Sequence, residues 1–487
     1  MERFLPWFNL GVFLVYLAVA MFRPDRSREG FDLAEFGRLP LLMNGRVQPF
    51  DSVARLGLFQ IRGTTTVPLE KTGLLTRGSL GATEWLLEVM AKPDAADARH
   101  IFPIQDPTLL RTLDLKQTEG SGPIYFTFRE LEPRLAAIGT QALEISSKVN
   151  AASRSEWQRE GLRLRNRLAV YQRLKNSLQP NTFLQHEAQG QPIAYDFAAG
   201  LSQYQIDLRV VVHAKQGKEQ QAIDQTTAER MRTFARPFAG VSRAEVLAIV
   251  PPAVPASSRD RWRGIGTAVV DSARTGQLAP PVAHFAEMSS AFARGRPAIF
   301  NLEVTKYRQW LTTNGLAPEV SKARYEFFNN LFQPFVRATA LYLVAFFLAC
   351  AFCFKQSTVL YRSAVMLVVL ACVVHTAGLL FGMMLEGRPP VTNAYSSIIF
   401  SGWGVVLLAG TVERFSRNGI GMATAALAGL IAIGAAHRLA PGGATALVQN
   451  VLDIPFVVVI LAVVIALCVG RDTKTASLRT AAAMAVA

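Results

Sequence analysis

The chain has 487 residues, 50% of them hydrophobic, and a formal net charge of +15 at neutral pH. This length allows two or three domains. We expect no nucleic-acid partner, because basic residues in a chain this apolar more often orient membrane segments or lie on solvated faces. The cysteines all fall in apolar segments, which excludes a disulfide-stabilised polar domain. They are Cys350, Cys353, Cys372 and Cys468.

The first apolar run covers residues 4–22, close to the ~20 residues that cross a bilayer as a helix. The small residues at 18–20 also fit the cleavage site of a secretory signal, so an anchor and a signal peptide both remain open. The run is long for a signal and only Arg3 precedes it as a basic residue, which favours an uncleaved transmembrane anchor at residues 1–22. In both cases the domain that follows is exported.

Residues 23–333 form a long polar region in which helical patterns dominate. Apolar residues recur at three- and four-residue steps in residues 125–150 and 155–180, which predicts a helical hairpin or one long helix ending at Pro180. Residues 206–214, with their consecutive valines, predict a strand. We therefore expect a large, mostly α-helical extracytoplasmic domain.

This polar region shows no catalytic group of residues. Residues 251–258 (PPAVPASS) predict a linker or surface loop. The histidines are scattered along the region, and we expect each to lie on the surface or to be hydrogen-bonded in the core. They are His100, His186, His213 and His284.

Further apolar runs cluster toward the C-terminus, and each is close to bilayer length. They cover residues 335–354, 363–385, 396–412, 420–440 and 454–470. We expect them to form a five-helix transmembrane bundle at residues 334–470, followed by a cytoplasmic tail at 471–487. The expected fold is a mainly α membrane protein with an N-terminal anchor, a large extracytoplasmic domain and this bundle, in contact with the lipid bilayer.

The charges of the short loops indicate the orientation of the bundle. With the N-terminus inside, the cytoplasmic loops hold most of the Lys and Arg residues, and the outer loops hold only Arg388 and Arg438. Arg23, Arg26 and Arg28 run against this bias, but the long domain behind them weakens their effect. The loop after residue 385 and His437 are thus expected on the extracytoplasmic side.

Two histidines of the bundle are candidate ligands. His375 lies inside the run 363–385, and an ionisable residue at bilayer depth is costly and a functional candidate. Neutral imidazole is a good ligand for haem iron, but an interhelical hydrogen bond or a small polar cavity explains the position equally well. His437 lies near the end of its run, where a histidine is also tolerated at the headgroups.

The Cys-x-x-Cys pair, Cys350 and Cys353, lies in apolar surroundings that raise the pKa of a thiol, so we interpret it as packing rather than as a redox pair. Phe354 follows, so the chain carries no haem-attachment motif of its own. A Gly-rich phosphate loop and zinc-type His/Glu spacing are absent from the sequence.

The stretch 374–421 carries a resemblance, and it reads VHTAGLLFGMMLEGRPPVTNAYSSIIFSGWGVVLLAGTVERFSRNGIG. It resembles the cytochrome c assembly family, and more narrowly the haem-handling CcsA-type component of system II cytochrome c synthases. In that family a HT-x-GL helix leads into an R-x-P-V-x-N-x-Y-x-S loop and an aromatic-tipped helix. The matching residues are His375, Thr376, Gly378, Leu379, Arg388, Pro390, Val391, Asn393, Tyr395, Ser397 and Trp403. Segments similar to the extracytoplasmic region of long family members are 43–58, 82–90, 171–180 and 300–311.

The resemblance implies a multi-pass protein of the bacterial inner (cytoplasmic) membrane that acts in cytochrome c-type biogenesis. Such a protein receives haem b, presents it outside the membrane and helps to join it to the Cys-x-x-Cys-His thiols of apocytochrome c. The implied cofactor-binding set has His375 and His437 as axial ligands of the iron and Arg388 against a haem propionate. Asn393, Tyr395 and Trp403 complete it; no catalytic residue is implied.

The chain also departs from the family pattern. The tryptophan-rich W-G-x-x-W-x-W-D segment is missing, Leu461 stands where a family histidine is expected, and Gly382 stands where an arginine is expected. The chain therefore fits a haem-handling subunit that is incomplete without a second subunit carrying the tryptophan-rich segment. It is then part of a haem lyase system and not an enzyme alone. A non-catalytic scaffold that docks apocytochrome or assembly partners, a truncated inactive member and a diverged relative remain open.

Overall fold

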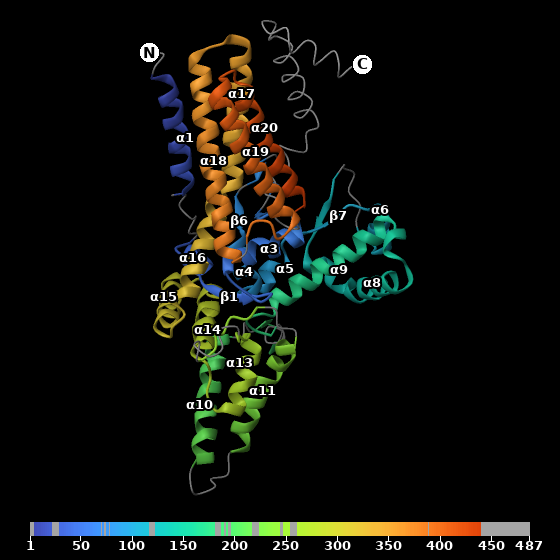
Figure 1. Cartoon of the computed structure of the whole chain (residues 1–487). Coiled ribbons are helices and arrows are strands. Elements are labelled where there is room, and N and C mark those ends of the chain that lie inside the picture. Colours follow the sequence, from blue (N-terminus) through green and yellow to red (C-terminus); the bar gives the residue numbers. More distant parts are fainter. Residues whose placement is uncertain are drawn as a thin grey trace. The chain divides into compact units, whose positions relative to one another are not determined.

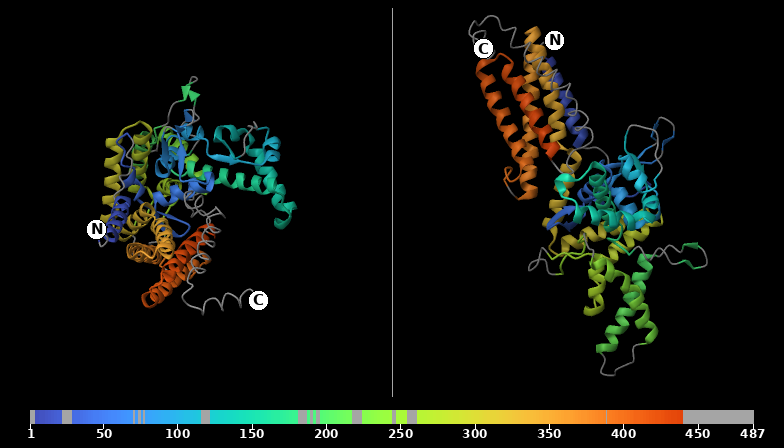
Figure 2. Two further views of the ribbon diagram at one scale, coloured as in Figure 1. Left: turned by 90° about the horizontal axis from the view of Figure 1, so that it is seen from above. Right: turned by 90° about the vertical axis from the view of Figure 1, so that its right-hand side faces the viewer.

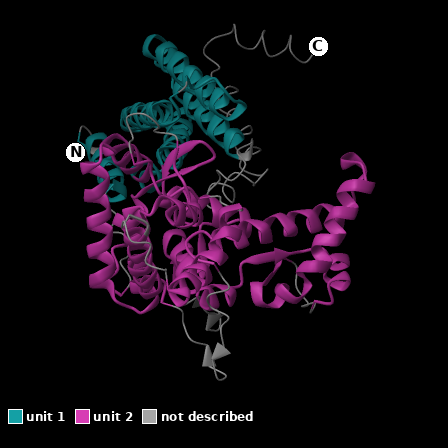
Figure 3. Cartoon of the chain, turned by 90° about the horizontal axis from the view of Figure 1, so that it is seen from below, with its two compact units in different colours: residues 1–24, 328–487 teal, residues 25–327 magenta. Residues whose placement is uncertain are grey.

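The computed structural model describes residues 4–21, 29–69, 71–72, 75–76, 78–115, 122–180, 187–188, 191–192, 196–216, 224–243, 247–253, 261–387 and 389–439. The chain forms two compact units, residues 1–24 with 328–487 and residues 25–327 (Figure 3). Helices dominate the described residues of both units, as predicted (Figure 1).

The first unit contains most of the apolar helical residues; the first long helix begins with residues 317–327 of the second unit. In the described residues, four helices are long and apolar enough to cross a membrane, so the protein is membrane-associated: Ala317–Lys355, Thr358–Glu386, Ala394–Ser416 and Ile420–His437. The unit is built from α1 (Leu5–Met21), α17 (Pro334–Lys355), α18 (Thr358–Glu386), α19 (Ala394–Ser416) and α20 (Ile420–Leu439). The predicted span 454–470 and the tail 471–487 lie outside the described residues.

Helix α1 is a shorter apolar helix (Pro6–Met21) that packs beside α18. Two polar contacts hold it to the long helices: Nη1 of Arg337 donates to the Tyr16 hydroxyl at 2.8 Å, and Nδ2 of Asn9 donates to Oγ of Ser363 at 3.1 Å. The Arg337 guanidinium also lies over the Tyr16 ring, 5.2 Å from its centroid. These contacts fit the predicted anchor, which stays a prediction.

Small residues let the long helices approach closely. Helices α19 and α20 lie against each other along their length, and α17 packs against both α18 and α20, as the right-hand view of Figure 2 shows in orange and red. A Cβ added at Gly402 of α19 would overlap the Cβ of Ala432 in α20. Close helix contact at glycine is a common way to pack membrane helices, because lipid gives no hydrophobic drive for their association.

A buried carboxylate closes the turn from α19 to α20. Glu413 is 1% exposed, and its two oxygens accept hydrogen bonds from the backbone N–H groups of Gly419 (2.8 Å) and Gly421 (2.9 Å). These are amides at the start of α20, which have no partner within the helix. Glu413 thus caps α20, and its negative charge lies at the positive end of the helix dipole.

The second unit begins with short helices and hairpins. Its elements up to residue 148 are α2 (Leu33–Gly37), β1 (Pro40–Met43), β2 (Arg46–Pro49), α3 (Phe50–Arg62), β3 (Thr66–Pro68), β4 (Lys71–Thr72), β5 (Leu75–Thr76), β6 (Ser79–Gly81), α4 (Ala82–Ala91), α5 (Pro93–Asp97), β7 (Phe102–Ile104), α6 (Pro107–Thr112), β8 (Ile124–Phe126), α7 (Phe128–Leu131), η1 (Glu132–Arg134) and α8 (Leu135–Lys148).

Longer helices follow. They and the remaining short elements are η2 (Ala151–Ser153), α9 (Glu156–Lys175), β9 (Glu187–Ala188), β10 (Gln191–Pro192), α10 (Phe197–Gln216), α11 (Gln225–Arg243), α13 (Ile265–Thr275), α14 (Pro280–Ala293), α15 (Pro297–Thr313) and α16 (Ala317–Phe332). The described strands form two-stranded antiparallel ladders, β1–β2, β3–β6, β4–β5, β7–β8 and β9–β10, and Leu42 of β1 also makes an antiparallel bridge to Ala248. In the β7–β8 ladder Phe102 lies opposite Phe126.

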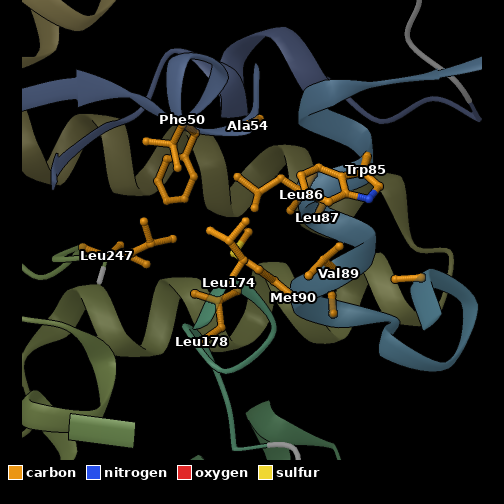
Figure 4. Packing of buried hydrophobic residues seen from close by; sticks show 14 of the residues in the cluster. Phe50, Ala54, Trp85, Leu86, Leu87, Val89, Met90, Leu174, Leu178 and Leu247 are labelled. Atoms are coloured by element: carbon orange, nitrogen blue, oxygen red, sulfur yellow. The ribbon is translucent and has the colours of Figure 1, made fainter. Parts of the chain in front are cut away.

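The core of the second unit joins segments that are far apart in the sequence. Phe50 of α3, Trp85 of α4 and Leu174 of α9 are almost fully buried in one hydrophobic cluster, together with Leu247 (Figure 4). Gly57 permits this contact, because a Cβ there would lie 3.0 Å from the Leu174 side chain. The core therefore fixes α3, α4 and α9 against one another.

Two local predictions for this unit need correction. The strand predicted at 206–214 is wrong, because these residues lie inside α10. Leu201, Tyr204 and Leu208 recur at three- and four-residue steps and are buried, so the helical period prevails over the valines. For residues 125–180, one long helix is wrong, but the alternative of a helical hairpin is confirmed by α8 and α9, which pack against each other. The helical part starts later than predicted, because β8, α7 and η1 precede α8.

The second predicted helix is confirmed as α9, but it ends at Lys175 and not at Pro180. Part of the predicted loop 251–258 lies outside the described residues, and 251–253 are irregular.

Candidate functional site

His375 is the least usual polar group of the first unit. It lies in the middle of α18, its side chain is 0% exposed, and its Nε2 has no hydrogen-bond partner among the described residues. The backbone carbonyl of Ile399 in α19 interacts with the imidazole without forming a hydrogen bond of normal geometry. Buried polar atoms without a partner are rare in proteins and call for an explanation.

The other imidazole nitrogen is engaged by α17. Nδ1 of His375 lies 3.3 Å from the Tyr342 hydroxyl, and the two rings are arranged edge to face. Phe335 meets the imidazole on another side, at 90° and 5.8 Å between centroids. Phe335 and Tyr342 are seven residues apart, which places them on one face of a helix. His375 is therefore held between two aromatic rings of α17.

Glycines make room for both rings. A Cβ at Gly378 would lie 2.8 Å from the Phe335 ring, and a Cβ at Gly429 of α20 would lie 2.6 Å from the Tyr342 ring. These distances are shorter than a carbon–carbon contact of about 3.5 Å. Helices α17, α18 and α20 thus pack closely around the imidazole.

Trp403 connects α19 to the helix that carries His375. Its indole Nε1 donates to Oγ1 of Thr376 at 2.8 Å, and Thr376 in turn donates to the Cys372 carbonyl. Phe400 stacks on the indole at 5.5 Å between centroids. Trp403 is therefore hydrogen-bonded to Thr376, the residue that follows His375 in α18.

His437 lies near the end of α20 and is 6% exposed. Its Nδ1 lies 2.7 Å from the Ile433 carbonyl oxygen, which can only accept, so Nδ1 carries the proton. In the neutral imidazole Nε2 then keeps its lone pair. Tyr395 meets the ring edge to face, at 6.1 Å between centroids.

A small hydrophobic cluster joins these groups. It consists of Leu379 of α18, Ile399 of α19 and Ala436 of α20. Partly buried rings pack against it, namely Phe335, Tyr395 and Trp403. Four of the predicted site residues, His375, His437, Tyr395 and Trp403, therefore line or adjoin one region of the first unit.

The other predicted site residues stand apart from this region. Asn393 is exposed and caps α19, because its Oδ1 accepts from the backbone N–H and the hydroxyl of Ser396, each at 2.8 Å. That role fully accounts for an asparagine at this position. Arg388 lies outside the described residues. Tyr342 and Phe335 were missed by the sequence reasoning; their signal is a seven-residue spacing of aromatic residues in one apolar run.

Among the described residues of the second unit, His284 takes part in a polar network. Nδ1 of His284 lies 2.8 Å from Glu303, and Nζ of Lys306 lies 2.7 Å from the other oxygen of that carboxylate. Burial alone raises the pKa of Glu303, but the hydrogen bonds from Lys306 and His284 outweigh it and the net pKa is lowered. The network is charge-compensated, which fits a structural role. His100 and His213 are exposed, as expected for surface histidines, and His186 lies outside the described residues.

The donor chemistry of the two bundle histidines fits a haem iron. Each has its Nδ1 engaged, by Tyr342 or by the Ile433 carbonyl, which leaves Nε2 as the atom to coordinate. Within the part of the chain that the structure describes, no group of three or more His, Cys, Asp or Glu side chains is arranged around a metal position. Haem supplies four nitrogen ligands itself and needs one or two from the protein.

Comparison with known proteins finds no protein-family model that matches the chain and no curated protein that matches it. The resemblance carried by residues 374–421 therefore stays a prediction.

Proposed function

We propose that this chain is a haem-handling membrane subunit of cytochrome c biogenesis. The observation that carries the proposal is His375, a fully buried imidazole in an apolar helix whose Nε2 has no partner in the described structure. An ionisable side chain inside a membrane segment is costly and is retained for a function. Iron coordination is a function that uses this free nitrogen.

In this proposal haem is the group that the protein carries. His375 holds its iron through Nε2, and His437 serves as a second ligand at the end of α20. Tyr395 and Trp403 supply aromatic surface beside the two imidazoles. Asn393 acts through the start of α19, which it caps. Arg388 is assigned to a haem propionate on the resemblance alone.

The proposed location is the bacterial inner membrane, with residues 23–333 on the extracytoplasmic side. There the chain would deliver haem for attachment to apocytochrome c. The tryptophan-rich segment of the family is absent from this sequence. In this proposal the chain acts as part of a haem lyase system together with a second subunit that carries the tryptophan-rich segment.

The test is the absorption spectrum and haem content of the full chain, purified in detergent from haem-replete cells. We expect near-stoichiometric haem in the wild type and a large loss in His375→Ala, with a loss in His437→Ala as well. His213→Ala, which removes an exposed histidine of α10, is the matched control and keeps its haem. A colourless wild type overturns haem handling by this chain and favours a scaffold that docks apocytochrome or assembly partners.

A further inference from the structure

We propose that Tyr342 is a positioning residue for His375: it holds Nδ1 and so makes Nε2 the coordinating atom. This inference rests on the proposed function. Its basis is one contact, the 3.3 Å approach of the Tyr342 hydroxyl to Nδ1, and one buried atom, Nε2, that makes no hydrogen bond of normal geometry in the described structure.

The chemistry of a neutral imidazole explains the consequence. The ring carries one proton, and coordination through Nε2 requires that proton to be on Nδ1. Nδ1–H then needs an acceptor, because an unpaired N–H in apolar surroundings is unfavourable. The Tyr342 oxygen lies in place to accept it. Partners of this kind fix the orientation of a ligating histidine and make it a stronger ligand.

The other polar groups around the His375 ring do not provide an acceptor for Nδ1–H. On α18, Oγ1 of Thr376 is bonded to the Cys372 carbonyl and to the indole of Trp403. On α19, the Ile399 carbonyl interacts with the ring but makes no hydrogen bond of normal geometry. Tyr342 is therefore the described hydrogen-bond partner of Nδ1.

The packing of Tyr342 is rigid enough for positioning. The side chain is fully buried in the core of the first unit. Gly429 of α20 lies directly against its ring, where even a methyl group would come within 2.6 Å. A substitution at Gly429 can therefore displace the ring while both the phenol and the imidazole side chains stay chemically unchanged.

Two variants of the full chain test the proposal. Tyr342→Phe removes only the hydroxyl, and Gly429→Ala displaces the ring. Loss of such a partner lowers metal affinity by roughly 10–100-fold, so we expect both variants to bind haem at least tenfold more weakly. The reduction potential of the haem that remains should rise, because the imidazole without its hydrogen bond donates less charge to the iron.

Matched controls separate positioning from general damage. Gly410→Ala adds the same methyl group to α19 where nothing lies within 4 Å, and Tyr325→Phe removes an exposed phenol. Both should keep the wild-type affinity and potential. If a variant loses haem and also melts at a lower temperature, two further measurements decide: the reduction potential of the remaining haem and the ¹⁵N signal of the His375 Nδ1. Loss of the Tyr342 hydrogen bond should change both.

A measurement without haem makes the inference independent of the proposed function. In protein labelled with ¹⁵N-histidine, Tyr342→Phe should shift the Nδ1 signal of His375 and leave that of His437 unchanged. A colourless wild type with this shift overturns the haem proposal and keeps the Tyr342–His375 bond. Wild-type haem affinity, potential and ¹⁵N signals in both variants overturn the positioning role.

Discussion

Two of the buried polar side chains of the first unit, Glu413 and His375, differ in how completely they are paired. Glu413 is as deeply buried as His375, but both of its oxygens accept backbone hydrogen bonds. A carboxylate satisfied in this way has a complete structural explanation as a helix cap. His375 has one nitrogen paired and one free. This difference, and not burial itself, makes His375 the functional candidate.

In the second unit, the carboxylate of Asp207 in α10 is also fully paired, and its pairing leads to a prediction of how stability depends on pH. Arg230 of α11 donates to both of its oxygens, at 2.8 and 3.0 Å, and Gln203 donates to one at 3.1 Å. The hydrogen bonds from Arg230 lower the pKa of Asp207 despite the burial of the carboxylate. In the unfolded chain the pKa returns to about 3.9.

The pH profile of thermal unfolding checks this. Since the folded pKa is the lower one, the stabilisation is complete above about pH 5 and is lost as the pH falls through the lowered value. Asp207→Asn should lower the melting temperature of the full chain at pH 7 and bring the two curves closer below about pH 4. Glu144→Gln, which removes a 60%-exposed partner of Lys148, is the control and should change little. Parallel Asp207→Asn and wild-type curves down to pH 3 would contradict the prediction.

At the scale of elements, the contact between α19 and α20 depends on one glycine. A Cβ at Gly402 would overlap that of Ala432, so Gly402→Ala must push the helices apart. Overpacking of this kind costs about 1–3 kcal/mol. We expect a clearly lower melting temperature in detergent for Gly402→Ala than for Gly410→Ala, whose added methyl group meets open space. Equal melting temperatures would show that α19 and α20 do not pack as described.

The sequence predicted long elements better than short ones. The apolar runs predicted the four long helices well, because a membrane-crossing helix needs about 20 apolar residues in succession and is therefore visible in the sequence along its length. Helix α9 begins close to the predicted place, but it ends at Lys175. Asn176 caps this end, because its N–H donates to the Gln172 carbonyl, and the later proline has no part in it. The strand predicted around Val210 failed because burial of Leu201, Tyr204 and Leu208 sets a helical period that β-branched residues do not override.

At the scale of the whole molecule, the sequence predicted the residues of the candidate site that lie on α18, α19 and α20, but not those on α17. His375, Trp403, Tyr395 and His437 lie within one stretch and come together through α18, α19 and α20. Tyr342 was missed because a tyrosine in an apolar run carries neither a charge nor a motif, and it meets His375 only through the packing of α17 against α18. Its approach depends further on Gly429, which no local pattern links to either residue.

The division into two units predicts that residues 29–327 fold without the apolar helices. That unit has its own hydrophobic core, which joins α3, α4, α9 and α14 through residues such as Phe50, Trp85 and Phe285. The expressed segment should be soluble, show a helical circular dichroism spectrum and unfold in one cooperative transition.

Trp85→Ala in the same segment is the matched test of that core. Trp85 is 0% exposed, and truncating a buried tryptophan costs about 3–5 kcal/mol. This is a large share of the roughly 5–15 kcal/mol by which a domain is stable, so the variant should melt far lower or fail to fold. A wild-type segment without a cooperative transition would mean that the core of residues 25–327 needs the helices of the first unit. A Trp85→Ala segment as stable as the wild type would mean that this core is packed differently.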